Sequence, residues 1–234
     1  MTEYLDVVRA MVWWRDRPVR WGEYAAWVSG YLGLPEFQDV AFVRIKSKGS
    51  WARLPFDRGG FGSLLAEGQP PEWAFCHPEG SGDRFHPMTT APMAFTNMLS
   101  DAAAESDAAR MISIFAADGG ASMAEIEYVG GEPGLEAVAR AFKASVKHWR
   151  ADGGAVTTLS LISALDTRAV GYLTYIRKAP AIESLPEGFV CEPDAEGVFI
   201  QPRGHLPVAN DPVTLAGLKS LKRALEAKHL LDDS

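Results

Sequence analysis

The feature that most constrains this chain is an amphipathic pattern at residues 135–149, flanked on both sides by short runs typical of β-strands. Its apolar side chains recur at three- and four-residue spacing: Leu135, Val138, Phe142, Val146 and Trp149. This spacing places them on one face of a helix, and such a face must be buried against another element. We expect the helix to open at Glu132-Pro133-Gly134 and to end at Gly153-Gly154.

Three further segments have helical signals. Residues 21–32 carry an aromatic stripe that ends before Gly33 and Pro35. Thr90 is a suitable N-cap for a helix that begins near Pro92. Asp211 is expected to cap a last helix, with Pro212 in its first turn. The inward side of that helix is expected to consist of four leucines: Leu215, Leu218, Leu221 and Leu225.

The remaining apolar runs are short and rich in β-branched and aromatic residues, which predicts strands. They lie at residues 5–14, 40–46, 111–116, 124–129, 156–162, 170–176 and 198–201. Residues 49–92, rich in Gly and Pro, predict an irregular stretch. Because strands and helices alternate irregularly, a doubly wound parallel sheet is disfavoured. The sequence predicts an α+β fold in which helices pack on a mixed, largely antiparallel sheet. Residues 1–234 can form a single domain, or two lobes with a boundary near 117–134, and both arrangements stay open.

Composition indicates a globular protein without a membrane segment. The chain has 234 residues, of which 47% are hydrophobic, and no run approaches the ~18 apolar residues of a membrane helix. The first residues lack the basic and apolar regions of a secretory signal. Cys76 and Cys191 are far apart, which favours a reducing compartment. We expect a soluble, cytoplasmic protein that does not bind membranes.

The net charge of −7 is unevenly distributed along the chain. Residues 61–138 hold Arg84 and Arg110 against twelve acids, whereas the segments on either side are close to neutral. This concentration disfavours nucleic acid as a partner and favours a cationic protein. A solvated acidic face that only aids solubility is the alternative.

Two acidic runs are the candidate partner-binding residues, and we expect both to contact a cationic partner. They comprise Asp101, Glu105 and Asp107 in the first, and Glu183, Glu187, Glu192, Asp194 and Glu196 in the second. The second run contains no base, so its carboxylates repel one another unless an external cation offsets them. Solvation of a loop is the alternative explanation for this run. We expect lysine at Glu187, Glu192 and Asp194 to weaken the complex or to slow its formation.

Signals for catalysis are weak. No phosphate-binding loop, GxSxG elbow or HExxH motif occurs, and Gly59-Gly60-Phe61-Gly62 lacks the spacing of a nucleotide loop. Cys76-His77 with Asp83 and His86 matches no zinc spacing and is interpreted as loop residues. Glu125 and Glu127 would share one face of a strand, either as a catalytic pair or, as we expect, as the wet face. The sequence therefore predicts no catalytic residues, no metal and no cofactor.

Six aromatic residues crowd positions 13–31: Trp13, Trp14, Trp21, Tyr24, Trp27 and Tyr31. Such side chains are common anchors in binding surfaces. Their helical spacing equally predicts burial in a core, which is the interpretation we favour, with one or two left exposed.

Several short motifs resemble the immunity protein 52 family of polymorphic toxin systems. Met11-Val12-Trp13-Trp14-Arg15-Asp16-Arg17, followed by the aromatic helix, resembles the start of its members. Val170-Gly171-Tyr172-Leu173-Thr174-Tyr175-Ile176 looks like the family's glycine–aromatic strand, and residues 197–200 and 210–231 follow in the same order. The resemblance covers the chain on both sides of residues 49–106.

The resemblance implies an immunity protein that inhibits a cognate toxin stoichiometrically. That toxin would be an effector with a restriction-endonuclease-like nuclease domain, from a type VI secretion or related system. Such a family carries no catalytic residues. Two other classes stay open: an effector adaptor or chaperone, and an enzyme whose site is built from dispersed residues such as Glu125, Glu127 or His86.

Overall fold

The chain forms two compact units. A computed structural model describes residues 8–15, 17, 23, 26–27, 30, 40–47, 50–53, 93–97, 110–115, 122–128, 135–178, 182, 185–203 and 211–231. Unit 1 comprises Met1–Trp13 and Glu132–Ser234, and unit 2 comprises Trp14–Gly131. The change of unit at 131–132 falls within the range 117–134 proposed for a lobe boundary, whereas the change at 13–14 has no signal in the sequence.

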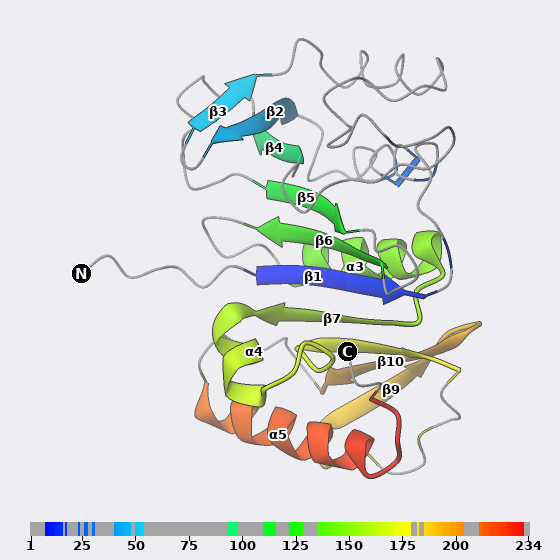
Figure 1. The fold of residues 1–234 in the computed structure, drawn as a ribbon. Helices are drawn as coiled ribbons and strands as arrows, with labels where there is room; N and C mark the ends of the chain where they lie inside the picture. Colours follow the sequence, from blue (N-terminus) through cyan, green and yellow to red (C-terminus); the bar gives the residue numbers. More distant parts are fainter. Residues whose placement is uncertain are drawn as a thin grey trace. The chain divides into compact units, whose positions relative to one another are not determined.

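Unit 2 is built on antiparallel strands. These are β2 (Val40–Ser47), β3 (Ser50–Arg53), β4 (Met93–Asn97), β5 (Arg110–Phe115) and β6 (Ser122–Tyr128). They lie in the order β3-β2-β4-β5-β6, and each neighbouring pair is antiparallel (Figure 1). Within the predicted helix at 21–32, the described positions Glu23, Ala26, Trp27 and Gly30 are helical.

The predicted helix starting near Pro92 is wrong, because Met93–Asn97 is strand β4. Phe42 of β2 lies opposite Phe95 of β4, and Met93 also lies opposite Ile112 of β5. A strand with partners on both edges satisfies its backbone hydrogen bonds without a helix. This tertiary pairing overrides the local cap signal of Thr90.

Unit 1 combines strands with three helices. The strands are β1 (Val8–Trp14), β7 (Gly153–Thr158), β8 (Leu173–Arg177), β9 (Phe189–Pro193) and β10 (Gly197–Pro202). Their order is β1-β7-β8-β10-β9, with antiparallel neighbours throughout. The helices are α3 (Leu135–Trp149), α4 (Leu159–Leu165) and α5 (Pro212–Glu226). The predicted α+β fold with helices packed on a largely antiparallel sheet is confirmed.

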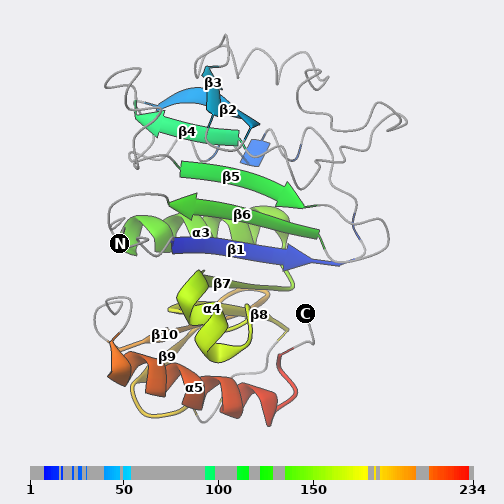
Figure 2. The same cartoon turned by 60° about the vertical axis from the view of Figure 1, so that its left-hand side comes forward.

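Helices cover both faces of the unit 1 sheet, as Figures 1 and 2 show. On one face, Val198 and Ile200 of β10 belong to a buried cluster that contains the α5 leucines Leu218, Leu221 and Leu225. On the other, Phe199 packs edge-on against Phe142 of α3, with ring centroids 6.1 Å apart. Because successive strand residues point to opposite faces, double coverage explains why all six residues of β7 are buried.

Gly153-Gly154 does not end α3, which stops at Trp149; the pair opens strand β7. A Cβ atom on Gly153 would lie 2.6 Å from the Trp13 indole. On Gly154 it would lie 2.8 Å from both the Met11 carbonyl oxygen and the Phe142 ring. The two glycines are therefore required by close packing within unit 1, not by a helix stop.

The predicted strand at 156–162 is also wrong beyond Thr158. The Thr158 hydroxyl accepts a hydrogen bond from the Leu161 N–H at 3.2 Å and so caps α4. Helix α4 ends at Asp166, which adopts the left-handed conformation with φ of 51°. Strands β7 and β8 still pair. The chain between them forms α4 and is not a tight turn at Asp166-Thr167-Arg168.

The last helix follows its prediction closely. The Asp211 carboxylate accepts hydrogen bonds from the N–H groups of Val213 and Thr214, and Pro212 lies in the first turn. Leu218, Leu221 and Leu225 are fully buried. Within the described part of the chain, no helix combines the length and apolar character needed to cross a membrane.

The packing around two glycines predicts opposite effects of alanine. Gly217 lies inside α5, where a Cβ would meet the Phe189 ring at an ordinary 3.5 Å. Gly217→Ala should therefore raise the free energy of unfolding by about 0.5–1 kcal/mol. Gly154→Ala has no such room and should lower it by about 1–3 kcal/mol. Urea denaturation of both variants measures this; equal effects would contradict the packing described for β7.

Candidate partner-binding surface

Most of the described part of the second acidic run lies in a β-hairpin. Glu192 lies in β9, while Asp194 and Glu196 lie in the turn to β10, and Glu187 precedes β9. All four side chains are exposed. Asp101, Glu105, Asp107 and Glu183 lie outside the described residues, as does most of the acidic middle third. We call β9, β10 and the four described carboxylates the acidic hairpin.

Backbone geometry fixes both ends of the acidic hairpin. At the tip, the Asp194 N–H donates to the Gly197 carbonyl at 2.9 Å, which leaves Ala195 and Glu196 as the turn. A Cβ on Gly197 would lie 2.9 Å from the Tyr175 hydroxyl, so that hydroxyl lies next to the turn. At the other end, Gly188 has φ of 90°, a conformation that favours glycine. The carboxylates therefore project from a defined scaffold.

Bases from distant parts of the chain offset two of these carboxylates. Lys143 Nζ of α3 lies 2.7 Å from Glu192 Oε2. Arg177 of β8 contacts Glu196 at 2.8 Å and Asp152 at 3.1 Å. The expectation that the run needs an external cation to offset its repulsion is thus wrong for Glu192 and Glu196. Within the described part of the chain, Glu187 and Asp194 make no ion pair, so these two carry the uncompensated charge.

An aromatic layer backs the acidic hairpin. Phe199 of β10 packs on Tyr175 of β8, with centroids 4.8 Å apart, and on Phe142 of α3. Lys143 Nζ lies 5.2 Å from the centre of the Phe199 ring, within the range of a cation–π contact. The same lysine therefore contacts both the aromatic layer and Glu192. Rigid packing below the carboxylates reduces the entropy lost when a partner binds.

Burial and nearby carboxylates perturb one group of this layer. Burial first, then Asp194 and Glu196, raise the pKa of Tyr175 to about 12, while Arg177 opposes the shift. A phenolate would be placed among negative charges in a poorly solvated position, so the neutral form is favoured. Tyr175 therefore acts as a neutral, apolar support and not as a proton donor near neutral pH.

Strand β9 ends the strand order of unit 1 among the described strands. The Phe189 N–H already donates to the Pro186 carbonyl at 3.3 Å, and Pro193 has no N–H. Both features hinder the addition of a foreign strand at this edge. Beside β9 lies an open depression of about 610 Å³, lined by Ile182, Leu185–Cys191 and Arg203. Contacts here would be made through side chains.

Of the three early aromatics that the structure describes, two are core residues, as expected. Trp14 and Trp27 are 1% and 3% exposed. Trp13 is half-buried, with its indole over Gly153. Trp21, Tyr24 and Tyr31 lie outside the described residues. The described aromatics therefore stabilise the fold and offer no exposed anchor.

The other candidate groups do not assemble into a described site. Glu125 is 3% exposed, so its interpretation as part of a wet strand face is wrong. The side chain of Glu127 and the group Cys76, His77, Asp83 and His86 lie outside the described residues. Among the residues that are described, no three His, Cys, Asp or Glu side chains gather to hold a metal ion.

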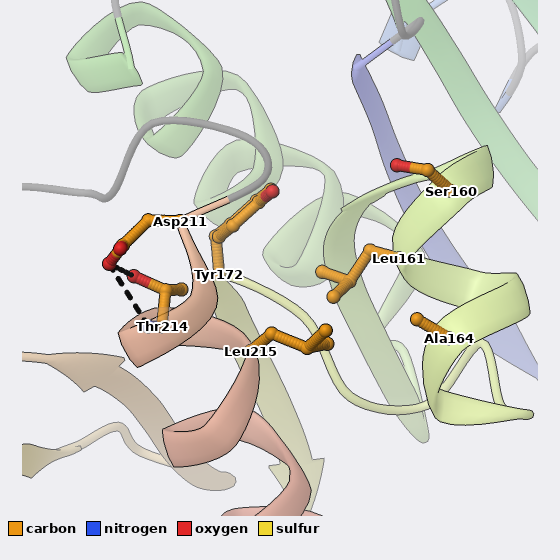
Figure 3. Close-up of a pocket in the computed structure, with 7 residues that line it drawn as sticks. All are labelled: Ser160, Leu161, Ala164, Tyr172, Asp211, Thr214 and Leu215. Atoms are coloured by element: carbon orange, nitrogen blue, oxygen red, sulfur yellow. Dashed lines mark hydrogen bonds between the residues drawn. The ribbon is translucent and has the colours of Figure 1, made fainter.

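A small pocket lies between α4 and α5, on a part of unit 1 that the sequence does not single out. Its volume is about 200 Å³, and it is lined by Ser160, Leu161, Ala164, Tyr172, Asp211, Thr214 and Leu215. Figure 3 shows the side chains of Leu161 and Leu215 pointing toward one another across the gap. The pocket is hidden in the sequence because residues 159–162 resemble the end of a strand. The signal that reveals it is Thr158, an N-cap residue three positions before Leu161.

The raised pKa of Tyr175 predicts how the stability of the fold changes with pH. The folded pKa of Tyr175, about 12, lies above the unfolded value of 10.0. Its contribution to stability is fully present below pH 10 and is lost as the pH rises toward 12. Titration of tyrosinate absorbance should show a late transition whose amplitude Tyr175→Phe lowers by one tyrosine, and Asp194→Asn should move that part of the transition to lower pH. Asp166→Asn, which removes a carboxylate elsewhere, should leave it unmoved; a late amplitude that Tyr175→Phe leaves unchanged would contradict the assignment.

Comparison with known proteins relates the chain to others through its fold. No protein-family model matches the sequence, and no curated protein sequence does so either. Among solved structures, the chain is similar to one described as the Pseudomonas aeruginosa T6SS protein PA0821, where T6SS denotes the type VI secretion system. The TM-score is 0.57 and the identity is 11%, over 95% of this chain and 77% of the other. The two proteins therefore share a fold.

Proposed function

We propose that this chain is an immunity protein that binds and neutralises a nuclease effector of a type VI secretion or related polymorphic toxin system. The observation that carries the proposal is the shared fold with a T6SS protein over 95% of the chain. The ordered motifs that resemble the immunity protein 52 family support it, above all the motif Val170–Ile176. Within that family the resemblance is to TsiT, the immunity partner of the effector TseT.

The chemistry of the acidic hairpin suits a nuclease as partner. A nuclease must attract phosphate, so its cleft is usually basic. Glu187 and Asp194 are exposed and carry charge that no described base offsets. They would speed encounter with such a cleft, and inhibition would follow from covering it, without any reaction catalysed by the inhibitor. A toxin that cuts DNA acts in the cytoplasm, which is where we place this chain.

Rescue of a poisoned cell tests the proposal directly. We expect bacteria that express the nuclease domain encoded beside this gene to survive only when this chain is co-expressed. The purified pair should form a complex of fixed stoichiometry in which DNA cleavage is abolished. A complex that still cleaves DNA would identify an adaptor or chaperone. Absence of any complex with the neighbouring effector would overturn the immunity role.

Charge substitutions test the surface separately from the role. Glu187→Gln with Asp194→Asn removes the two uncompensated charges of the acidic hairpin. We expect association to slow several-fold at low salt, with a weaker dependence on ionic strength, because steering depends on such charges. Asp166→Asn with Glu226→Gln is the control: it removes two exposed carboxylates elsewhere in unit 1, of which Glu226 pairs with Lys222.

Stopped-flow measurement of both double variants decides the point. An equal slowing in both would show that net charge alone matters, and would contradict the assignment to the acidic hairpin. The three-lysine variant at Glu187, Glu192 and Asp194 is less informative, because lysine at position 192 would also lie beside Lys143.

A further inference from the structure

The pocket between α4 and α5 has chemistry that the acidic hairpin lacks. Among the described residues, the large hydrophobic side chains that are exposed are Leu159, at 51%, and Val213, at 79%. Each is the chain neighbour of a residue that lines the pocket, Ser160 and Thr214 respectively. Single exposed apolar side chains are ordinary on a surface, and it is the lining of the pocket that distinguishes this part of unit 1.

The size of the pocket limits what it can hold. At about 200 Å³ it is smaller than the pockets of roughly 300–1,000 Å³ that hold cofactors and drug-sized ligands. Leu161, Ala164 and Leu215 provide apolar walls, while Ser160, Tyr172 and Thr214 contribute hydroxyl groups (Figure 3). This combination suits one long side chain with an apolar stem and a polar tip.

The charge at the pocket determines which polar group the end of that bound side chain can carry. Asp211 is exposed, so its carboxyl is ionised at neutral pH as in an ordinary aspartate, and hydrogen bonds from Thr214 lower its pKa further. Its Oδ2 accepts from the Thr214 N–H and hydroxyl, whereas Oδ1 accepts from the Val213 N–H. Because a carboxylate has about four acceptor positions, Oδ1 can accept one more hydrogen bond. A cationic tip satisfies this position, whereas an apolar tip leaves it without a partner. The full negative charge of Asp211 exceeds the partial positive charge of the α5 N-terminus, so a cationic tip is favoured over an acidic one.

We propose that this pocket is an anchor site that takes one arginine or lysine side chain of the toxin, with the stem between α4 and α5 and the cation on Asp211. This inference rests on the proposed function, since it takes the toxin as the source of that side chain. Long basic side chains bury their stems along apolar walls while the charged end reaches a polar rim.

The pocket can be tested without the toxin. The full-length, ¹⁵N-labelled chain is titrated with N-acetyl-arginine amide and N-acetyl-lysine amide, and with N-acetyl-norleucine amide as the uncharged control. We expect saturable amide shifts confined to residues near the starts of α4 and α5, with affinities on the order of millimolar for ligands this small. Norleucine amide should bind about tenfold more weakly. Equal binding of norleucine amide, or no saturable shift with arginine or lysine amide, would overturn the proposal.

Two pocket variants, each with a control, test whether arginine amide binds in this pocket. Ala164→Leu fills the pocket with a residue of high helix propensity, and Ala216→Leu makes the same change at an exposed α5 position outside the pocket lining. Asp211→Asn removes the charge but keeps a good N-cap, and Asp166→Asn is its control at an exposed αL position that asparagine tolerates. We expect Ala164→Leu and Asp211→Asn to lose the arginine shifts, and both controls to keep them, with cooperative melting of all four variants. Asp211→Asn should melt slightly lower, because an amide has one acceptor oxygen where the carboxylate has two.

The toxin complex then distinguishes the two proposals. Calorimetric titration should show Ala164→Leu weakening toxin binding by about tenfold or more, with Ala216→Leu unchanged, as expected for a central anchor contact. Arginine binding in the pocket without any toxin complex would overturn the immunity role and leave a cation pocket in place. A tight, neutralising complex that Ala164→Leu leaves unaffected would overturn the anchor site and leave the immunity role intact.

Discussion

The double-sided burial of β10 is the constraint on which the rest of unit 1 depends. Val198 and Ile200 face the leucines of α5, while Phe199 faces α3 through Phe142. One strand supplies alternate side chains to two cores. Strand β10 therefore cannot shift by one residue against its neighbours without exchanging the residues on its two faces. The register of β10 with β8 and β9 thereby fixes where Glu192, Asp194 and Glu196 emerge.

The same register explains why the charge of the hairpin differs from that of its sequence. Phe199 lies opposite Tyr175 and Glu192 lies opposite Phe199, so the α3 face of the sheet meets the carboxylates at this point. Lys143 reaches from α3 across Phe199 to Glu192. A run of fourteen residues without a base is therefore offset by bases 49 residues away for Glu192 and in a neighbouring strand for Glu196. Charge read along the chain overestimates the field that a partner meets.

The sequence predicts a helix or strand well where one strong local pattern, such as helical periodicity or an N-cap, determines it. Helix α3 and the Asp211 cap of α5 follow directly from periodicity and capping chemistry. The failures share a different cause. Gly153-Gly154 has the composition of a helix stop but is shaped by the Trp13 indole and the Met11 carbonyl, which no local window contains. Strand β9 was missed because its acids and Pro193 resemble a loop, while its pairing with β10 decides the outcome. The same holds for the candidate site. The acidic residues can be found in the sequence, but their ion pairs with Lys143 and Arg177, and the pocket between α4 and α5, cannot.

Whether a surface carboxylate already has an ion pair affects how much it can contribute to the specificity of a binding surface. Surface carboxylates that already hold a lysine or arginine must lose that contact before they can take a new one, so their net contribution to binding is small. Glu187 and Asp194 lose no such contact, and Asp211 keeps its cap while it still accepts one further donor. Fast encounter requires only that the first two be charged, whereas a long-lived complex requires a desolvated contact. Under the proposed function, the shallow charged hairpin would supply the first property but not the second. The pocket with apolar walls and one carboxylate would supply the second, because a wrong side chain there would leave either an apolar wall wet or a charge unpaired.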